Sequence, residues 1–182
     1  MKKKVLALVL AMVLLVVGVA AGTLAWLTSK SDTVTNTFTT SDIKVELEET
    51  KNDFKMVPGF TIDKDPKVTV KAGSEDCYLF VKLEKSSNFD SFLTYVTAEN
   101  WTLLTGVDGV YYRVVRASNA DQSFGILKDN KVTVLSTVTK EMMNGLTQDT
   151  YPTLTVSAYA SQLYKSAGEE FTEAEAWANV QS

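Results

Sequence analysis

The sequence predicts an all-β fold, namely an antiparallel two-sheet β-sandwich with short peripheral helices. Apolar and polar residues alternate with a period of two in six short segments, which is typical of half-buried strands. Turn residues separate these segments, and little helical periodicity lies between them. The chain has 182 residues, of which 45% are hydrophobic. It is therefore long enough for one domain in which two sheets bury a shared core.

An export signal is predicted at the N-terminus. Lysines at positions 2–4 precede an apolar run over residues 5–21, and a stretch of small residues ends at Ala25. A charged start, an apolar helix and a small-residue exit are the three parts of a secretory signal. We expect cleavage after Ala25, with Thr23 as the second small residue of the site, and cleavage after Ala21 is the alternative. A retained membrane anchor is the other interpretation, since the apolar run approaches the length of a membrane span.

Three parts are expected along the chain. They are a signal peptide over residues 1–25, an N-terminal strand segment over 26–48, and a β-sandwich domain over 49–182. Three of the 18 Lys and Arg residues lie in the signal, whereas all 22 Asp and Glu residues lie outside it, so cleavage shifts the formal net charge from −4 to about −7. An acidic chain without clustered basic residues is not expected to bind nucleic acid.

The alternating segments give the expected strands in chain order. Asp108-Gly109 stands between two β-favouring runs and predicts the turn of a hairpin. The strands themselves are expected over residues 43–47, 67–71, 77–84, 110–115, 131–135 and 153–158.

Three short helices are expected over residues 87–96, 139–144 and 172–180. The second is predicted to end at Gly145, and Trp177 of the third is predicted to pack on the sandwich. Capping boxes are expected at the start of the first and third helices. The residues that carry these signals are Ser87 with Asp90, Thr172 with Glu175, and the helically spaced Phe89, Phe92, Leu93 and Val96.

Composition excludes most hydrolase chemistry. The chain has no His and one Cys, so Ser-His-Asp and Cys-His nucleophiles, His-ligated metals, HExxH peptidase sites and an intramolecular disulfide are all excluded. Cys77 lies on the apolar face of its predicted strand and is expected to be a small buried hydrophobe rather than a reactive thiol. The sequence predicts no catalytic residue, no cofactor and no metal site.

Several side chains have both a functional and a structural interpretation. Carboxylates at 63, 65 and 121 could bind calcium, but exposed turn residues are the preferred interpretation. Glutamates at 46, 48 and 49 could act in acid–base chemistry, but a solvated strand face explains them. The aromatic residues could stack on sugars, but packing between strands is more frequent. These aromatic residues are Trp101, Tyr111 and Tyr112, of which the first lies within a glycosylation sequon, Asn100-Trp101-Thr102.

Several short motifs follow one another in a specific order along the chain. They are Gly22-Thr-Leu-Ala-Trp-Leu-Thr-Ser-Lys30, Val34-Thr-Asn-Thr-Phe38, Ile43-Lys-Val-Glu-Leu47, Val57-Pro-Gly59, Lys64-Asp-Pro66, Val68-Thr-Val70, Pro152-Thr-Leu-Thr-Val156, Ala158-Tyr-Ala160 and Ala174-Glu-Ala-Trp177. Their order resembles the TasA/camelysin family of Gram-positive bacteria. The resemblance implies a jelly-roll sandwich, a signal peptide cut by a SipW-type signal peptidase, and assembly into extracellular fibres of the biofilm matrix.

In fibres of this family the N-terminal segment of one subunit adds as a strand to the next. Here one face of a β-favouring stretch carries the even-numbered residues Val34, Asn36 and Phe38. The apolar residues of 43–47 are odd-numbered, so one regular strand cannot place both sets on the same face. The phase break at 39–42 has two interpretations. A bulge or a switch between sheets is one. The other is that the earlier stretch completes the sheet of a neighbouring subunit.

The preferred hypothesis from the sequence is a secreted structural subunit of matrix fibres. Its expected partners are copies of itself, the signal peptidase and an accessory fibre anchor. Contact with a membrane is expected only through the uncleaved signal peptide. Two alternatives stay open, a camelysin-like cell-surface metallopeptidase and a monomeric surface adhesin or binding module. The expected location is the extracellular matrix or cell surface of a Gram-positive bacterium.

Overall fold

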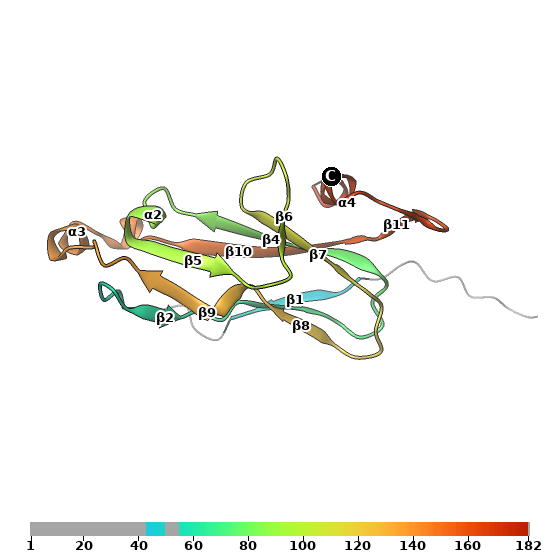
Figure 1. Cartoon of the computed structure of the whole chain (residues 1–182), viewed down its shortest axis with the longest axis horizontal. Helices are drawn as coiled ribbons and strands as arrows, with labels where there is room; N and C mark the ends of the chain where they lie inside the picture. Colours follow the sequence, from blue (N-terminus) through green and yellow to red (C-terminus); the bar gives the residue numbers. More distant parts are fainter. Residues whose placement is uncertain (1–42, 50–54, 182) are drawn as a thin grey trace, which may run out of the picture. The chain divides into compact units, whose positions relative to one another are not determined.

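The computed structural model describes residues 43–49 and 55–181 (Figure 1). These residues belong to one unit, which runs from Thr40 to Ser182. The predicted signal peptide and its cleavage residues, Thr23 and Ala25, lie outside the described residues. In the described part of the chain, no helix is both long and apolar enough to cross a membrane.

The prediction of an all-β fold is confirmed, because strands dominate and every strand pairing is antiparallel. Within the described ranges the strands form sheets in the orders β1-β3-β8, β10-β4-β7-β6, β2-β9-β5 and β11-β12. The strands are β1 (Val45–Glu48), β2 (Thr61–Asp63), β3 (Lys67–Val70), β4 (Cys77–Lys85), β5 (Leu93–Thr97), β6 (Thr102–Leu103), β7 (Val110–Val115), β8 (Gln122–Gly125), β9 (Leu127–Val134), β10 (Leu154–Gln162), β11 (Tyr164–Ser166) and β12 (Glu169–Glu170).

One main core joins the three larger sheets. Val68 of β3, Leu79 and Val81 of β4, and Val134 of β9 are each fully buried in the same apolar cluster. Burying one such side chain contributes about 1.5–3 kcal/mol relative to leaving it exposed. The alternation read from the sequence therefore places one face of each of these sheets in this core.

Strand β4 is buried on both faces, which the sequence prediction missed. The expected apolar face enters the main core, but Tyr78 and Phe80 on the other face are also buried. They pack in a second cluster with Trp177, whose ring centroid lies 5.2 Å from that of Phe80. An uninterrupted apolar run from Cys77 to Val81 is typical of a strand covered on both sides.

The second and third predicted helices are confirmed, with helix α3 at Lys140–Asn144 and helix α4 at Glu173–Asn179. Gly145 caps the first of these, as predicted. The capping box of α4 is present, because the Thr172 hydroxyl accepts from the backbone of Glu175 and the Glu175 carboxylate accepts from the backbone of Thr172. A short 3-10 turn, η1 (Gln148–Thr150), lies between α3 and β10.

The helix predicted over residues 87–96 is wrong in its second half. Helix α2 covers only Phe89–Phe92, its N-cap is Asn88, and no side chain caps it. The chain then continues as β5, which pairs with β9. Residues 94–97 are β-branched or aromatic, so local propensity and the long-range partner both favour a strand there.

The hairpin predicted at Asp108-Gly109 is confirmed, since β6 and β7 pair on either side of it. Gly109 has φ +68, and a Cβ atom at this position would clash with the carbonyl oxygen of Leu83. Both the left-handed backbone and the close approach to β4 require glycine.

Candidate functional site

An apolar groove of about 860 Å³ opens at the end of the fold that holds α2 and α3. Its walls come from strands β2, β5, β9 and β10, from both short helices, and from the loops between them. The residues that line it are Glu49, Lys55, Met56, Ile62, Lys64, Phe89, Leu93, Val132, Met143, Leu146, Gln148, Tyr151, Pro152, Thr153 and Leu154.

The floor of the groove is part of the main core. Phe89, Leu93 and Val132 are buried and belong to the main apolar cluster. Met143 and Leu154, with other partly buried apolar residues, pack against that cluster and form the sides. A partly covered apolar surface of this size gains stability when another apolar segment occupies it.

An ion pair lies at the rim of the groove. The Nζ atom of Lys64 lies 2.6 Å from Oε1 of Glu49, and the two side chains are only 12% and 25% exposed. The other two glutamates of this stretch, Glu46 and Glu48, pair with lysines of β3 and its following loop. The three carboxylates therefore hold the β1 region to neighbouring segments, and the structure does not arrange them as an acid–base pair.

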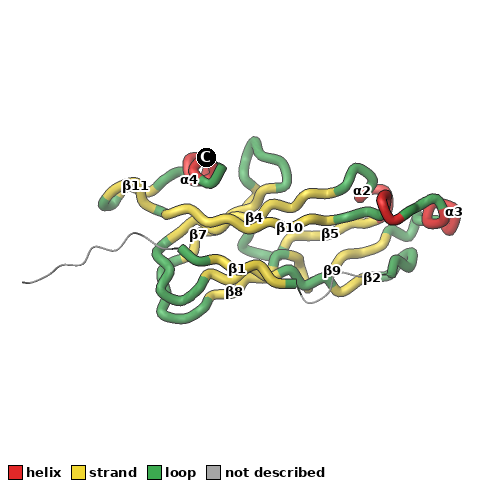
Figure 2. The backbone as a smooth tube through the Cα atoms, turned by 180° about the vertical axis from the view of Figure 1, so that it is seen from behind, coloured by secondary structure: helices red, strands yellow, loops and turns green. Residues whose placement is uncertain are grey.

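Strand β10 starts at the groove, which its first residue, Leu154, lines, and it forms an edge of its sheet. It is nine residues long and carries no charged side chain. It pairs with β4 along its full length, and among the described residues no strand pairs with its other edge, although β1 of another sheet also lies close to β10. Figures 1 and 2 show it leading from the end that holds α3 to the end that holds β11. Long uncharged edges readily accept a further strand, and most proteins avoid or cover them.

Two hydrogen bonds fix which backbone groups of β10 face outward. The Thr153 carbonyl accepts from the Ser86 amide at 3.0 Å, and the Leu163 amide donates to the Asp76 carbonyl at 3.0 Å. The register between β10 and β4 is continuous, and in an antiparallel pair successive residues alternate between bonding the partner and pointing away. The odd-numbered residues therefore bond β4. The N–H and C=O groups of the even-numbered residues, such as Ala158 and Ala160, face the open edge.

The described chain begins at the end of β1 that is far from the groove. At this end, the Lys44 amide donates to the Ser74 hydroxyl, and the Lys44 carbonyl accepts from the Lys71 amide. At the other end of the same strand, Glu49 already lines the groove. The candidate assembly residues, Val34, Asn36 and Phe38, lie outside the described residues.

Two of the three aspartates considered for calcium are used in local ion pairs. Asp63 pairs with Lys131 across β2 and β9, whereas Asp121 accepts from the Ala72 amide at 2.8 Å and pairs with Lys71. The bond from Ala72, followed by that from Lys71, lowers the pKa of Asp121. No group of three or more potential metal-ligating side chains occurs within residues 43–49 and 55–181.

Cys77 and Trp101 are structural residues. Cys77 is fully buried, as predicted, and burial raises the pKa of its thiol to about 11. Trp101 is buried, and its Nε1 donates to the Gly125 carbonyl at 2.9 Å. Tyr112 packs against Tyr78 and Phe80. These contacts agree with the packing interpretation of the aromatic residues.

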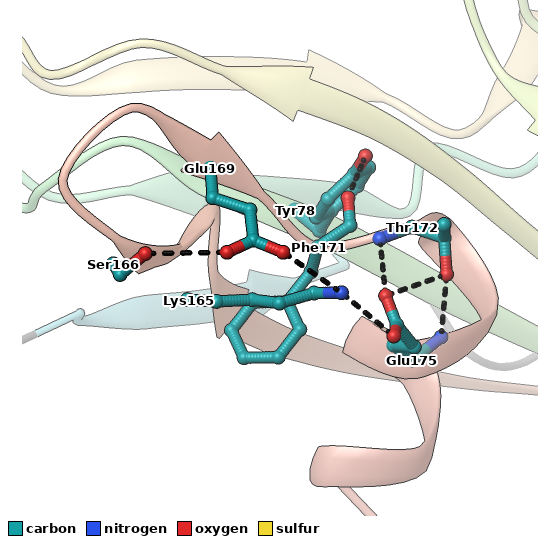
Figure 3. A network of polar contacts seen from close by, with 7 residues as sticks. All are labelled: Tyr78, Lys165, Ser166, Glu169, Phe171, Thr172 and Glu175. Carbon is teal, nitrogen blue, oxygen red and sulfur yellow. Dashed lines mark hydrogen bonds and ion pairs between the residues drawn. The ribbon is translucent and has the colours of Figure 1, made fainter.

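A polar network fixes the C-terminal hairpin to helix α4 (Figure 3). Lys165 pairs with Glu175 at 2.7 Å, and the Tyr78 hydroxyl donates to the Phe171 carbonyl at 2.9 Å. The bond from Lys165, followed by those from the Thr172 amide and hydroxyl, lowers the pKa of Glu175 to about 2. This network anchors the C-terminal hairpin to the helix that follows it.

Sequence reasoning missed the groove. Its residues come from several separate stretches of the chain, among them 55–56, where no element was predicted, and 143–154, which runs from the predicted helix over 139–144 into the predicted strand over 153–158. The available signal was the apolar character of Met56, Met143 and Leu146. Isolated apolar residues of this kind also occur where a small apolar cluster packs under a loop, so they do not by themselves indicate a groove.

Fold and groove together define the class, which is an all-β protein of several antiparallel sheets with an apolar groove beside a long open strand edge. Comparison with protein-family models, with curated proteins and with solved structures finds no match.

Proposed function

We propose that this chain is a secreted structural subunit of extracellular matrix fibres, and that subunits assemble by exchanging a strand. In this proposal the three larger sheets form a jelly-roll sandwich. A SipW-type signal peptidase removes residues 1–25, and the mature chain acts in the matrix or on the surface of a Gram-positive bacterium. Its role is mechanical rather than catalytic, and it requires no cofactor.

The open edge of β10 beside the apolar groove is the observation that carries this proposal. A strand added at this edge finds outward N–H and C=O groups from alternate residues of β10. The side chains on one of its faces cover the groove. Main-chain bonds then provide affinity, and the groove selects the side chains, which is the general mode of recognition by strand addition.

The proposed occupant is residues 33–38 of a second copy. This stretch is β-favouring and uncharged, and it places Val34, Asn36 and Phe38 on one face. Strand β10 spans about 30 Å at the usual rise per residue. The described chain begins at the end of β1 opposite the groove, and in this proposal the donor segment leaves its own subunit at that end and enters the groove of the next copy.

A contact of this kind joins two different surfaces of the subunit. The donor leaves one end of the fold, and the acceptor lies at the other end. Such a heterologous contact repeats from copy to copy and forms an open filament when the rotation between copies does not close a ring. In this proposal, fibres form without an additional interface.

Electron microscopy and light scattering of the mature chain, residues 26–182, test the proposal. We expect regular filaments above a threshold concentration and none after deletion of residues 26–41. Phe38→Asp should raise the threshold strongly, because a charge at an apolar joint has no partner. Thr37→Asp is the matched control, since position 37 lies on the other face of the segment and should have a much smaller effect.

Two results would overturn the proposal. Filaments that form equally well without residues 26–41 would exclude the donor segment. A mature chain that stays monomeric at all concentrations and pH values would favour the alternative of a monomeric binding module.

A further inference from the structure

The methionines of this chain are unevenly distributed. Of its five, Met1 and Met12 lie in the predicted signal peptide. Met56 and Met143 both line the groove, where both are partly exposed. Met142, next to the latter on helix α3, is exposed and does not line the groove.

Methionine gives the groove an adaptable wall. Its unbranched side chain fills irregular gaps, and its thioether is apolar but polarisable, which is why binding surfaces that accept varied side chains use it. The same sulfur is also the readily oxidised atom of such a surface. In a protein that acts outside the cell, both side chains are open to oxidants from solution.

We propose that Met56 and Met143 are oxidation sites through which peroxide controls the groove. The inference rests on the proposed role of the groove as acceptor of a neighbouring strand. In the reaction the thioether sulfur attacks hydrogen peroxide, an S–O bond forms, and the O–O bond breaks. The sulfur loses two electrons and the peroxide is reduced to water, so each methionine becomes a sulfoxide.

A sulfoxide changes what the groove can bind. It places a polar oxygen in a wall that otherwise packs against the main apolar cluster through Met143, Leu146 and Leu154. An incoming strand would then have to desolvate this oxygen, which opposes binding. We expect oxidation to weaken strand exchange without unfolding the subunit, because both side chains lie at the rim of the core and neither is fully buried.

The experiment uses the mature chain and hydrogen peroxide, with methionine sulfoxide located by peptide mass spectrometry. We expect sulfoxide at both groove methionines and a threshold concentration for fibres that rises about tenfold or more. Methionine sulfoxide reductases should restore the original threshold. Circular dichroism checks that the oxidised chain stays folded.

Two variants test whether the peroxide effect comes from the groove methionines or from the exposed Met142. Met56→Leu combined with Met143→Leu keeps the apolar volume, and the fibre threshold of this variant, measured first without peroxide, should not change when peroxide is added. Met142→Leu is the matched control, and its fibres should stay as sensitive to peroxide as those of the original chain.

The outcomes distinguish this inference from the function on which it rests. A reduced chain that forms no fibres overturns the proposed function and this inference with it. Fibres that form with an unchanged threshold after both groove methionines are oxidised overturn the inference alone. Oxidation confined to Met142 does the same, since it would mean that peroxide does not reach the groove.

Discussion

Replacing Ala158 by proline tests whether the open edge of β10 binds another strand. Ala158 is an even-numbered residue, so its N–H faces the open edge and does not bond β4. Proline removes this donor and places its ring where a neighbouring strand would lie, whereas the bonds to β4 are kept. The substitution should therefore act on assembly far more than on folding.

The expected size of the effect follows from the number of bonds lost. One lost intersubunit hydrogen bond costs about 1 kcal/mol, and steric exclusion of the bonds at the flanking even-numbered residues raises the total to about 3 kcal/mol. The threshold concentration for fibres should rise about 5-fold to 150-fold. Fixing φ at this position should lower the free energy of unfolding by only about 1 kcal/mol.

Urea unfolding and light scattering measure the two effects on the same protein. Ala160→Pro, at the next outward position, should reproduce the result. Tyr159→Pro is the contrasting control, because it removes a bond to β4 and should destabilise the fold itself. A folded Ala158→Pro variant with an unchanged fibre threshold would show that this edge is not the acceptor.

Three further predictions concern the subunit itself. Gly109→Ala should lower the free energy of unfolding by about 2 kcal/mol or more in urea titrations, since its Cβ would meet the Leu83 carbonyl and its φ is positive; an unchanged midpoint would contradict the close approach. Cys77 should resist alkylation in the folded protein up to about pH 10 and react at once after unfolding, because the pKa of its thiol is raised to about 11; rapid labelling at pH 8 would contradict its burial. The folded-state pKa of Glu175 is lowered from 4.5 to about 2, so its contribution to stability is complete above about pH 4.5 and is lost as the pH falls towards 2. Glu175→Gln should flatten this part of the stability profile, and an unchanged slope in acid titrations would show that the bond to Lys165 does not persist in solution.

Local signals predicted the elements that local contacts build. The turn at Gly109 and the cap at Thr172 depend on residues within a few positions of one another, and both are present. The helix predicted over 139–144 is also present, and the Thr139 hydroxyl, which was not predicted as a cap, accepts from the amide of Met142 within one helical turn. Such bonds need only a short stretch of sequence, but the capping box expected at Ser87 and Asp90 is absent, because the helix there begins after Asn88 and no side chain caps it.

Long-range pairing explains what the sequence did not reveal. Leu93 and Val96 have helical spacing relative to Phe89, yet the segment from Leu93 onward is a strand because it pairs with β9, more than 30 residues later. The groove depends in the same way on contacts between distant segments, such as that between Glu49 and Lys64 at its rim. No periodicity within a single window records which distant segments meet.

The way β1 is held has a mechanical consequence for a fibre. Strand β1 pairs antiparallel with β3 over four successive residue pairs, and Glu46 and Glu48 add ion pairs alongside the ladder. In the proposed assembly, tension between subunits enters each fold at Ile43 and pulls β1 along its own axis. The ladder is then loaded in shear, so that its bonds share the force and must break together rather than open one by one. Tensile strength of the filament would thus be set by the β1–β3 pair as much as by the exchanged strand.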